Sequence, residues 1–128
     1  MAPPSAASRV TIVTVSYNSL HVLPRMLDSV PEGASVVIVD NASDAPEPLA
    51  ELCRTHGARL IRNSRNLGFG VACNLGAAGA QTEFLLFLNP DAALMPDALD
   101  QLVAAADRYP KASAMNPRIA DDDGPFFK

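Results

Sequence analysis

The residues that decide the fold read VTIVTVSYN, from Val10 to Asn18. Apolar and β-branched residues follow one another up to Val15 without the polar alternation of a half-exposed strand. Such a run predicts a strand covered on both faces, in the middle of a parallel sheet. The polar residues SYN then lie directly beyond the carboxyl end of this strand.

Three further runs of the same kind follow along the chain: SVVIV at 35–39, ARLI at 58–61 and FLLFL at 84–88. We therefore expect central strands at residues 10–15, 35–39, 58–61 and 84–88. A fifth strand is expected at residues 111–119, where Pro117 restricts it to an edge or an irregular strand.

Helical periodicity separates these runs. Positions 99, 102, 103 and 106 are apolar and share one helical face, which predicts a helix at residues 96–109. Further helices are expected at residues 20–30, with Pro24 near the first turn, at 46–56, closed by Gly57, and at 70–80. The alternation predicts the α/β class: a doubly wound, mainly parallel sheet flanked by helices on both faces.

Length and composition exclude several classes of protein. The chain has 128 residues, 48% of them hydrophobic, which indicates one domain with a real core. A net charge of −4 argues against nucleic acid or an anionic membrane surface as partner. No apolar run approaches the roughly 20 residues of a transmembrane helix. Residues 1–8 lack the hydrophobic stretch of a signal peptide, so we expect them to form a flexible N-terminus. We expect a cytoplasmic protein, with Cys53 and Cys73 as core residues.

Polar residues follow every predicted strand. The candidate ligand-binding residues are Ser16, Tyr17 and Asn18 after the first strand, Asp40 and Asn41 after the second, Arg65, Asn66 and Gly68 after the third, and Asn89 and Asp91 after the fourth. Ligands of doubly wound sheets bind at the carboxyl ends of the strands, where these loops meet. The alternative is that such residues only cap the helices that follow.

The residue types at these ends suit a nucleotide. A carboxylate beyond a buried strand, such as Asp91, can share a hard divalent cation with phosphates. Asp40 can accept hydrogen bonds from ribose hydroxyls or a base N–H, and Gly68 lets the backbone approach an anion at a helix N-terminus. Residues 68–70 read GFG, but Cys73 stands where a dinucleotide-binding motif needs its third glycine. His21 and His56 have no partner at catalytic spacing, which indicates surface residues.

Four ordered motifs resemble a known family: VTIVTVSYN (10–18), VVIVDNAS (36–43), RNLGFGVACNLG (65–76) and FLLFLNPD (84–91). Together they resemble the N-terminal nucleotide-sugar-binding half of family 2 glycosyltransferases, which have the Rossmann-like GT-A fold. Within that family, the motifs are most similar to those of the rhamnosyltransferase-like branch. The resemblance implies that Asp91 binds Mg²⁺ or Mn²⁺ as the last residue of a D-x-D-type element, with Asn89 auxiliary. It also places base and ribose at residues 16–18 and Asp40, and the nucleotide pocket at residues 65–68, with Asn41 and Asn74 in the nucleotide-binding set.

The same resemblance implies an inverting, metal-dependent glycosyltransferase of polysaccharide biosynthesis. It would transfer a sugar from a UDP- or dTDP-type donor to a glycan or lipid-linked acceptor, in the cytoplasm or peripherally at the inner face of the membrane. Residues 9–120 would form the donor-binding domain and residues 121–128 the start of an acceptor-side segment, with the catalytic base beyond Lys128. Asp121, Asp122 and Asp123 are candidates for that base by charge alone. The alternative is a non-catalytic nucleotide-binding or interaction module of the same fold, which includes a homodimer formed through an exposed sheet edge.

Overall fold

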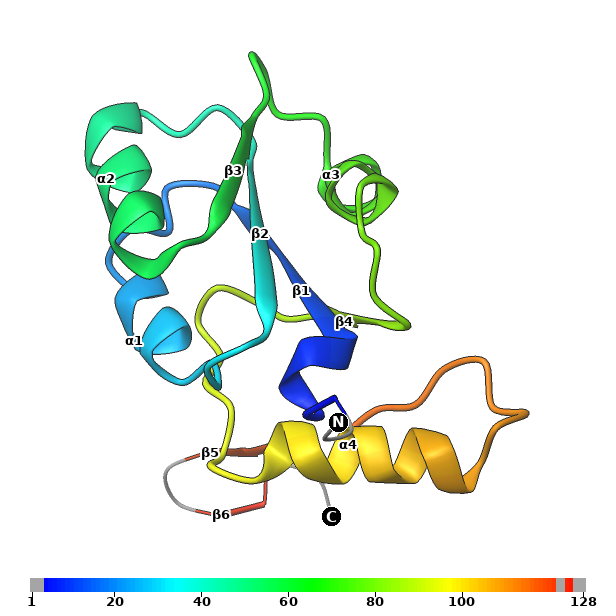
Figure 1. Cartoon of the computed structure of the whole chain (residues 1–128). Coiled ribbons are helices and arrows are strands. Elements are labelled where there is room, and N and C mark those ends of the chain that lie inside the picture. The colour runs from blue at the N-terminus through cyan, green and yellow to red at the C-terminus, as the bar shows by residue number, and fades with distance from the viewer. Residues whose placement is uncertain (1–3, 122–123, 126–128) are drawn as a thin grey trace.

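The computed structural model describes residues 4–121 and 124–125. Its centre is a parallel sheet of four strands in the order β3-β2-β1-β4 (Figure 1). The strands are β1 (Val10–Ser16), β2 (Ser35–Asp40), β3 (Arg59–Arg62) and β4 (Phe84–Phe87). Each lies within a residue or so of a predicted strand.

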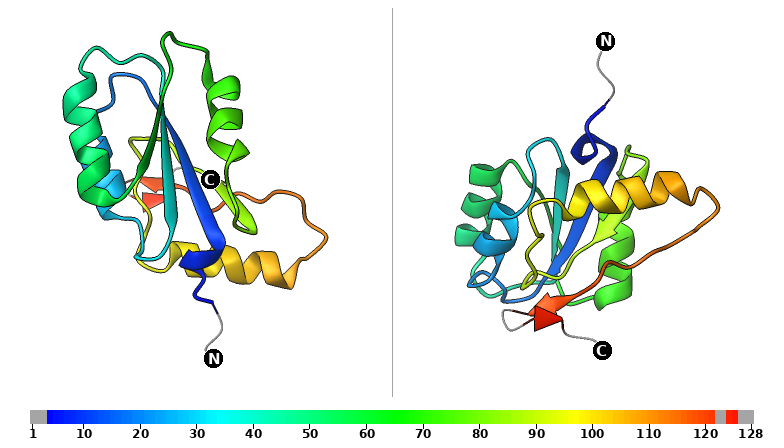
Figure 2. Two further views of the ribbon diagram at one scale, coloured as in Figure 1. Left: turned by 45° about the horizontal axis from the view of Figure 1, so that its top comes forward. Right: turned by 90° about the horizontal axis from the view of Figure 1, so that it is seen from below.

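Helices cover both faces of this sheet, as the sequence predicts. They are α1 (Leu23–Asp28), α2 (Pro46–His56), α3 (Phe69–Ala78) and α4 (Ala98–Arg108), preceded by a short 3-10 helix at Ala7–Arg9. The first, second and fourth helices pack on one face, and α3 packs alone on the other (Figures 1 and 2). The doubly wound α/β fold is therefore confirmed.

Strand register explains which side chains reach which face. Ile12 and Ile38 are fully buried on the side of α1, α2 and α4, and Val13 and Val39 pack towards α3 on the other side. Ser16 pairs with Asp40, which pairs in turn with a residue of β3. The carboxyl ends of three neighbouring strands are thus level, so the loops beyond them lie at one edge.

Local sequence signals set the helix ends. Helix α2 has the predicted bounds, because Pro46 fits a first turn and Gly57 adopts φ 67° at the end. Helix α1 is shorter than expected, with Pro24 in its first turn. Helix α4 begins two residues later than predicted, with Asp97 at its N-cap position.

Two expectations about strands are wrong. Residues 111–119 form no strand; only short strands β5 (Ala120–Asp121) and β6 (Gly124–Pro125) follow, paired with each other. Residues 109–119 are exposed and pair with no other strand among the described residues. In addition, β3 and β4 are edge strands of the four-stranded sheet, not central ones.

Other expectations concern the core and the chain ends. Both cysteines are buried and free, as predicted, and burial raises the pKa of each thiol. Over residues 4–121 and 124–125, no helix has the length and apolar character needed to cross a membrane. Residues 1–3 of the expected N-terminal segment lie outside the described residues. So do residues 122–123, which include two of the acidic candidates for the base, and residues 126–128.

Candidate functional site

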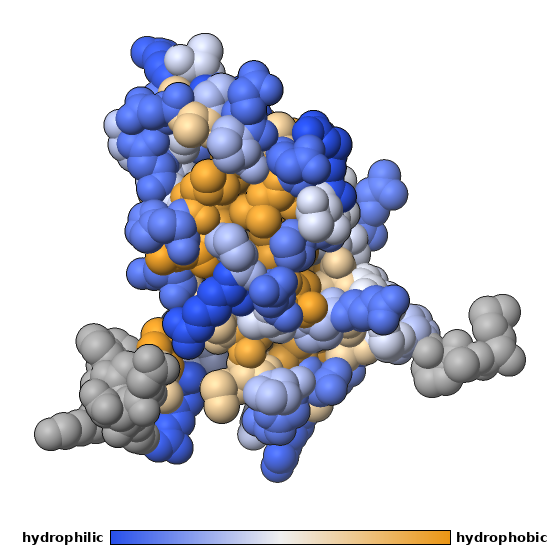
Figure 3. All heavy atoms as spheres, turned by 90° about the vertical axis from the view of Figure 1, so that its left-hand side faces the viewer, coloured by the Kyte–Doolittle hydropathy of each residue, from blue (hydrophilic) through white to orange (hydrophobic). Residues whose placement is uncertain are grey.

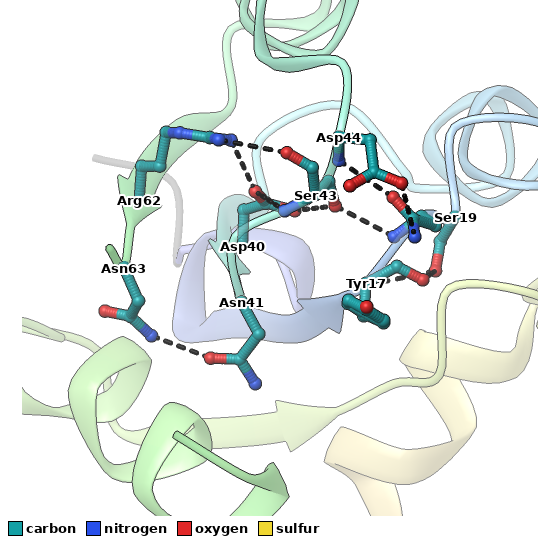
Figure 4. Close-up of polar contacts among 9 residues, drawn as sticks. Tyr17, Ser19, Asp40, Asn41, Ser43, Asp44, Arg62 and Asn63 are labelled. Carbon is teal, nitrogen blue, oxygen red and sulfur yellow. Dashed lines mark hydrogen bonds and ion pairs between the residues drawn. The ribbon is translucent and has the colours of Figure 1, made fainter. Parts of the chain in front are cut away.

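Asp40, at the end of β2, is the centre of a polar network and is completely buried. Its Oδ2 atom accepts hydrogen bonds from the backbone N–H of Ser43 at 3.0 Å and from Arg62 Nη1 at 2.7 Å. Its Oδ1 atom accepts a hydrogen bond from the Ser43 hydroxyl (Figure 4). Three donors therefore satisfy a carboxylate that would otherwise be costly to bury.

The Ser43 hydroxyl connects this carboxylate to the loop after β1. It accepts a hydrogen bond from the backbone N–H of Asn18 at 2.8 Å. The Asn18 side chain in turn accepts the Asp44 backbone N–H at 2.9 Å and donates to the Asp44 carboxylate at 3.4 Å. Asn18 has φ 50°, a left-handed conformation that asparagine tolerates better than most residues. The loops after β1 and β2 are thus cross-linked.

Asn41 connects β2 to the loop before α3. Its Oδ1 atom accepts hydrogen bonds from Asn63 Nδ2 at 2.9 Å and from the Leu67 backbone N–H at 3.3 Å. Its Nδ2 atom donates to the Gly68 carbonyl at 3.2 Å. Gly68 has φ 84°, and its N–H donates to Asn66 Oδ1 at 2.9 Å. The backbone at the start of α3 is therefore held by two asparagine side chains.

Exposed groups surround this buried frame. Tyr17 has 52% of its surface exposed and Phe69 has 61%, so each offers an aromatic ring to a ligand. Arg65 is exposed on the loop between β3 and α3. A flat base and a phosphate chain could both find contacts here.

Asn89 and Asp91 follow β4 and are exposed. They lie in a turn closed by the Ala92 N–H, which donates to the Asn89 carbonyl at 3.1 Å. Among residues 4–121 and 124–125, no three acidic, histidine or cysteine side chains gather into a metal-binding group. A cation at Asp91 would accordingly take most of its ligands from a bound molecule and from water.

Asn74 is not brought into this network. Ala72, Cys73 and Gly76 form the buried face of α3, and Asn74 lies two residues from both Ala72 and Gly76, on the exposed side. Ser16 lies at the site edge with its hydroxyl buried and without a hydrogen-bond partner among the described residues.

A pocket of about 380 Å³ opens between the loops after β1 and β2, on the side of α1 and α2. On this side of the molecule, hydrophobic atoms are visible between hydrophilic side chains (Figure 3). The residues that line the pocket are Ser16, Asn18, Ser19, Leu20, His21, Ser43, Asp44, Ala45 and Leu49.

Four members of the network are not among the candidate ligand-binding residues that the sequence predicts: Ser43, Asp44 and Asn63, which lie in the polar segments after the predicted strands, and Arg62. Arg62 could have been found, because a basic residue at the end of one strand and an acidic residue at the end of its neighbour suggest an ion pair. The predicted strand ended one residue too early to show it. Ser43 stands three residues after Asp40, a spacing typical of a carboxylate that accepts a backbone N–H in a turn.

The four-stranded parallel sheet, with helices on both faces and polar loops at one edge, is the architecture of the GT-A glycosyltransferases. A crystal structure of S. aureus TarS in complex with UDP superposes with a TM-score of 0.70 at 22% identity, covering 89% of this chain and 38% of that one. Glucosyl-3-phosphoglycerate synthase from Mycobacterium tuberculosis, in complex with Mn²⁺, UDP and glucosyl-3-phosphoglycerate, superposes with a TM-score of 0.57 at 15% identity, covering 81% and 40% of the two chains. The chain belongs to glycosyl transferase family 2, whose family model matches residues 11–128.

Curated relatives agree with this assignment. The N-acetylglucosaminyl-diphospho-decaprenol L-rhamnosyltransferase of M. tuberculosis is 33% identical over 131 residues, covering 91% of this chain. The succinoglycan biosynthesis protein ExoO of Rhizobium meliloti is 35% identical over 103 residues, covering 77% of this chain. The chain spans 43% of the first relative and 30% of the second, so it corresponds to less than half of either.

Proposed function

We propose that this chain binds a nucleoside diphosphate sugar of the UDP or dTDP type at the carboxyl ends of its strands. The observation that carries the proposal is the network around Asp40, which joins the loops after β1 and β2 to the end of β3 in a member of glycosyl transferase family 2. Because these loops are already held in place, little conformational entropy has to be lost when a ligand binds to them. Residues 9–120 are the donor-binding domain in this proposal.

The described residues divide into those that hold the loops and those that face the ligand. Asp40 and Asn41 are buried and use their side chains on the protein itself. Tyr17 and Arg65 are exposed and available to stack on a base and to pair with phosphate. The backbone at the start of α3, near Gly68, is suited to approach an anion closely.

Asp91 is the proposed ligand for Mg²⁺ or Mn²⁺. The Asp91 carboxylate and the nearby Asn89 amide oxygen are hard oxygen donors of the kind both ions prefer, and a diphosphate would supply more. When bound, the ion would offset the charge of the departing diphosphate. The complex of the M. tuberculosis synthase with Mn²⁺ and UDP supports the same pairing of ligands.

We further propose that the whole protein is an inverting transferase acting on a glycan or lipid-linked acceptor. The names of the rhamnosyltransferase and succinoglycan relatives support this acceptor class. A lipid-linked acceptor would bring the enzyme to the inner face of the membrane. The catalytic base is not assigned to any described residue, and residues 121–128 begin the proposed acceptor-side segment.

Calorimetric titration with UDP, dTDP and GDP, each with and without Mn²⁺, tests the proposal. We expect the pyrimidine diphosphates to bind, and to bind more tightly with the metal. Asp91→Ala should remove the metal-dependent gain, about ten- to a hundredfold in affinity, and leave metal-free binding unchanged.

Asp100→Ala is the matched control, because Asp100 is an exposed aspartate on α4. It should behave like the unaltered chain. Equal affinity with and without metal would refute the role of Asp91, and no heat with any of the three nucleotides would refute donor binding.

A further inference from the structure

The segment that carries Asp91 is fixed to two other elements of the fold. The Leu88 N–H, three residues before Asp91, donates to the Val13 carbonyl of β1 at 3.0 Å. The Leu94 N–H, three residues after Asp91, donates to the Ser29 hydroxyl at the end of α1 at 2.9 Å. Figure 1 shows this segment passing beside α1 on its way from β4 to α4. Asp91 therefore lies at the centre of a bridge between β1 and α1.

The Ser29 hydroxyl is held in an orientation that suits an acceptor. It donates its one proton to the Met26 carbonyl at 2.6 Å, which leaves its lone pairs for the Leu94 N–H. The Ser29 backbone N–H also donates to the Met26 carbonyl, at 3.1 Å. Because Met26 is fully buried in the core, this end of α1 is a firm support for the segment.

The Asp91 carboxylate depends on the bridge for its position. It is exposed, and among the described residues it has no hydrogen-bond or ion-pair partner. Three residues of extended chain span at most about 10 Å, so a fixed residue on each side confines Asp91 to a small volume. The Leu94 side chain also packs against the cluster that contains Leu99 and Val103, but apolar packing has no preferred direction. The hydrogen bond to Ser29 therefore sets the direction of the backbone at Leu94.

We propose that Ser29 is a positioning residue for the metal site, in a role that rests on the proposed function of Asp91 as a ligand for Mg²⁺ or Mn²⁺. Its hydroxyl would hold the segment so that the Asp91 carboxylate is in place when a diphosphate and its cation bind. Without the hydroxyl, hydrogen bonding would fix the segment on one side of Asp91 only, and binding of the cation would have to order the rest. Ser29 acts through the Leu94 backbone and is not itself a ligand in this proposal.

The location of Ser29 separates this role from nucleotide binding. Ser29 follows the last residue of α1, at the opposite end of the helix from the loop after β1. Its hydrogen-bond partners among the described residues lie in α1 and in the segment after β4, and none belongs to the network around Asp40. Loss of the hydroxyl should therefore affect the part of binding that depends on metal.

Calorimetric titration of the whole 128-residue chain with UDP, with and without Mn²⁺, tests this role in Ser29→Ala. We expect the metal-dependent gain in affinity to fall about fivefold, the equivalent of one lost hydrogen bond, and the metal-free affinity to change less than about twofold. Ser29→Thr keeps a hydroxyl and should restore the gain. Thr55→Ala is the matched control, because the exposed Thr55 hydroxyl donates to a carbonyl of its own helix, that of Glu51 at 3.0 Å, and it should keep the gain.

Amide hydrogen exchange gives a second readout that needs neither metal nor nucleotide. In Ser29→Ala the Leu94 amide should exchange about fivefold faster or more, whereas the Leu88 amide, which is bonded to β1, should keep its rate. An unchanged rate at Leu94 would overturn the proposal.

The titrations distinguish this proposal from the proposed function on which it rests. A metal-dependent gain that is present in the unaltered chain and persists in Ser29→Ala would overturn the role of Ser29 alone. Equal losses of metal-free and metal-dependent affinity would overturn it too, because Ser29 would then support the whole fold. If Mn²⁺ gives the unaltered chain no gain, the role of Asp91 is refuted, and that of Ser29 with it.

Discussion

Asp40 is expected to stabilise the fold as well as the site. Its replacement by asparagine removes a charge that accepts hydrogen bonds from Ser43 and Arg62 in a fully buried position. We predict that Asp40→Asn lowers the free energy of unfolding in urea by about 3 kcal/mol. Asp44→Asn, at an exposed aspartate of the same loop, should change it by less than about 0.5 kcal/mol. Equal effects of the two substitutions would show that the network around Asp40 is not a scaffold.

At the level of residues, the sequence predicts where polar side chains lie but not what they bond. Polar residues after parallel strands had to meet at one edge, and residues 16–18, Asp40 and Asn41 do so. The Asp40–Arg62 ion pair depends on the register between β2 and β3, which local sequence does not encode. Asn74, which the family resemblance puts in the nucleotide-binding set, lies on the exposed side of α3, and its part in binding stays a prediction.

The contact between α3 and the sheet depends on a glycine. A Cβ atom on Gly76 would lie 2.4 Å from Val13 Cγ1 and 3.0 Å from Val39 Cγ2. We predict that Gly76→Ala lowers the free energy of unfolding by about 1–3 kcal/mol, because α3 must move away from the sheet. Gly70→Ala, in the same helix with no atom within 4 Å, should raise it by about 0.5 kcal/mol or more through helix propensity. Thermal or urea unfolding of both variants decides the point, and a destabilising Gly70→Ala would contradict the packing argument.

Helices α1 and α2 are joined by a pH-dependent contact. His56 Nε2 lies 3.0 Å from Asp28 Oδ1, and this hydrogen bond, with one to the Leu52 carbonyl, raises the pKa of His56. The folded chain therefore holds the proton more tightly than the unfolded chain. The contact therefore stabilises the fold fully below the pKa of about 6.5 that His56 has in the unfolded chain. This contribution is lost as the pH rises through the pKa of His56 in the folded chain.

We predict accordingly that the stability difference between the unaltered chain and His56→Gln, measured by urea unfolding, shrinks as the pH rises above about 6.5 and through the raised folded pKa of His56. Asp28→Asn should produce the same change, since it removes the partner that has the largest effect on the pKa. A difference that stays constant or grows with pH would show that the imidazolium is not stabilised by this contact.

Elements with strong local signals were predictable, and elements that need a distant partner were not. Helix α2 was located by Pro46 and Gly57 alone, because both act within one turn of the chain. Residues 111–119 pair with no strand among the described residues, and β4 is as apolar as a central strand yet lies at an edge of the described four-stranded sheet. A strand's place in a sheet is decided by pairing over long sequence separations, which periodicity cannot show.

For the molecule as a whole, the central claim is that a nucleoside diphosphate binds at the carboxyl ends of the strands, with a metal ion at Asp91. The other end of the sheet offers a fair comparison, because a pocket of about 430 Å³ lies there, lined in part by Ser35, Arg59 and Gln81. A ligand that binds without regard to the proposed site would affect both ends alike.

The most direct test is a nuclear magnetic resonance titration of the isotopically labelled chain with UDP, followed by Mn²⁺. The account predicts amide shift changes in the loops after β1, β2 and β3, at residues 17–18, 41–44 and 63–68. It then predicts paramagnetic broadening centred on Asp91, with Ser35 and Gln81 unaffected. Shift changes at the amino ends of the strands, or broadening that is no stronger at Asp91 than at Asp100, would contradict it.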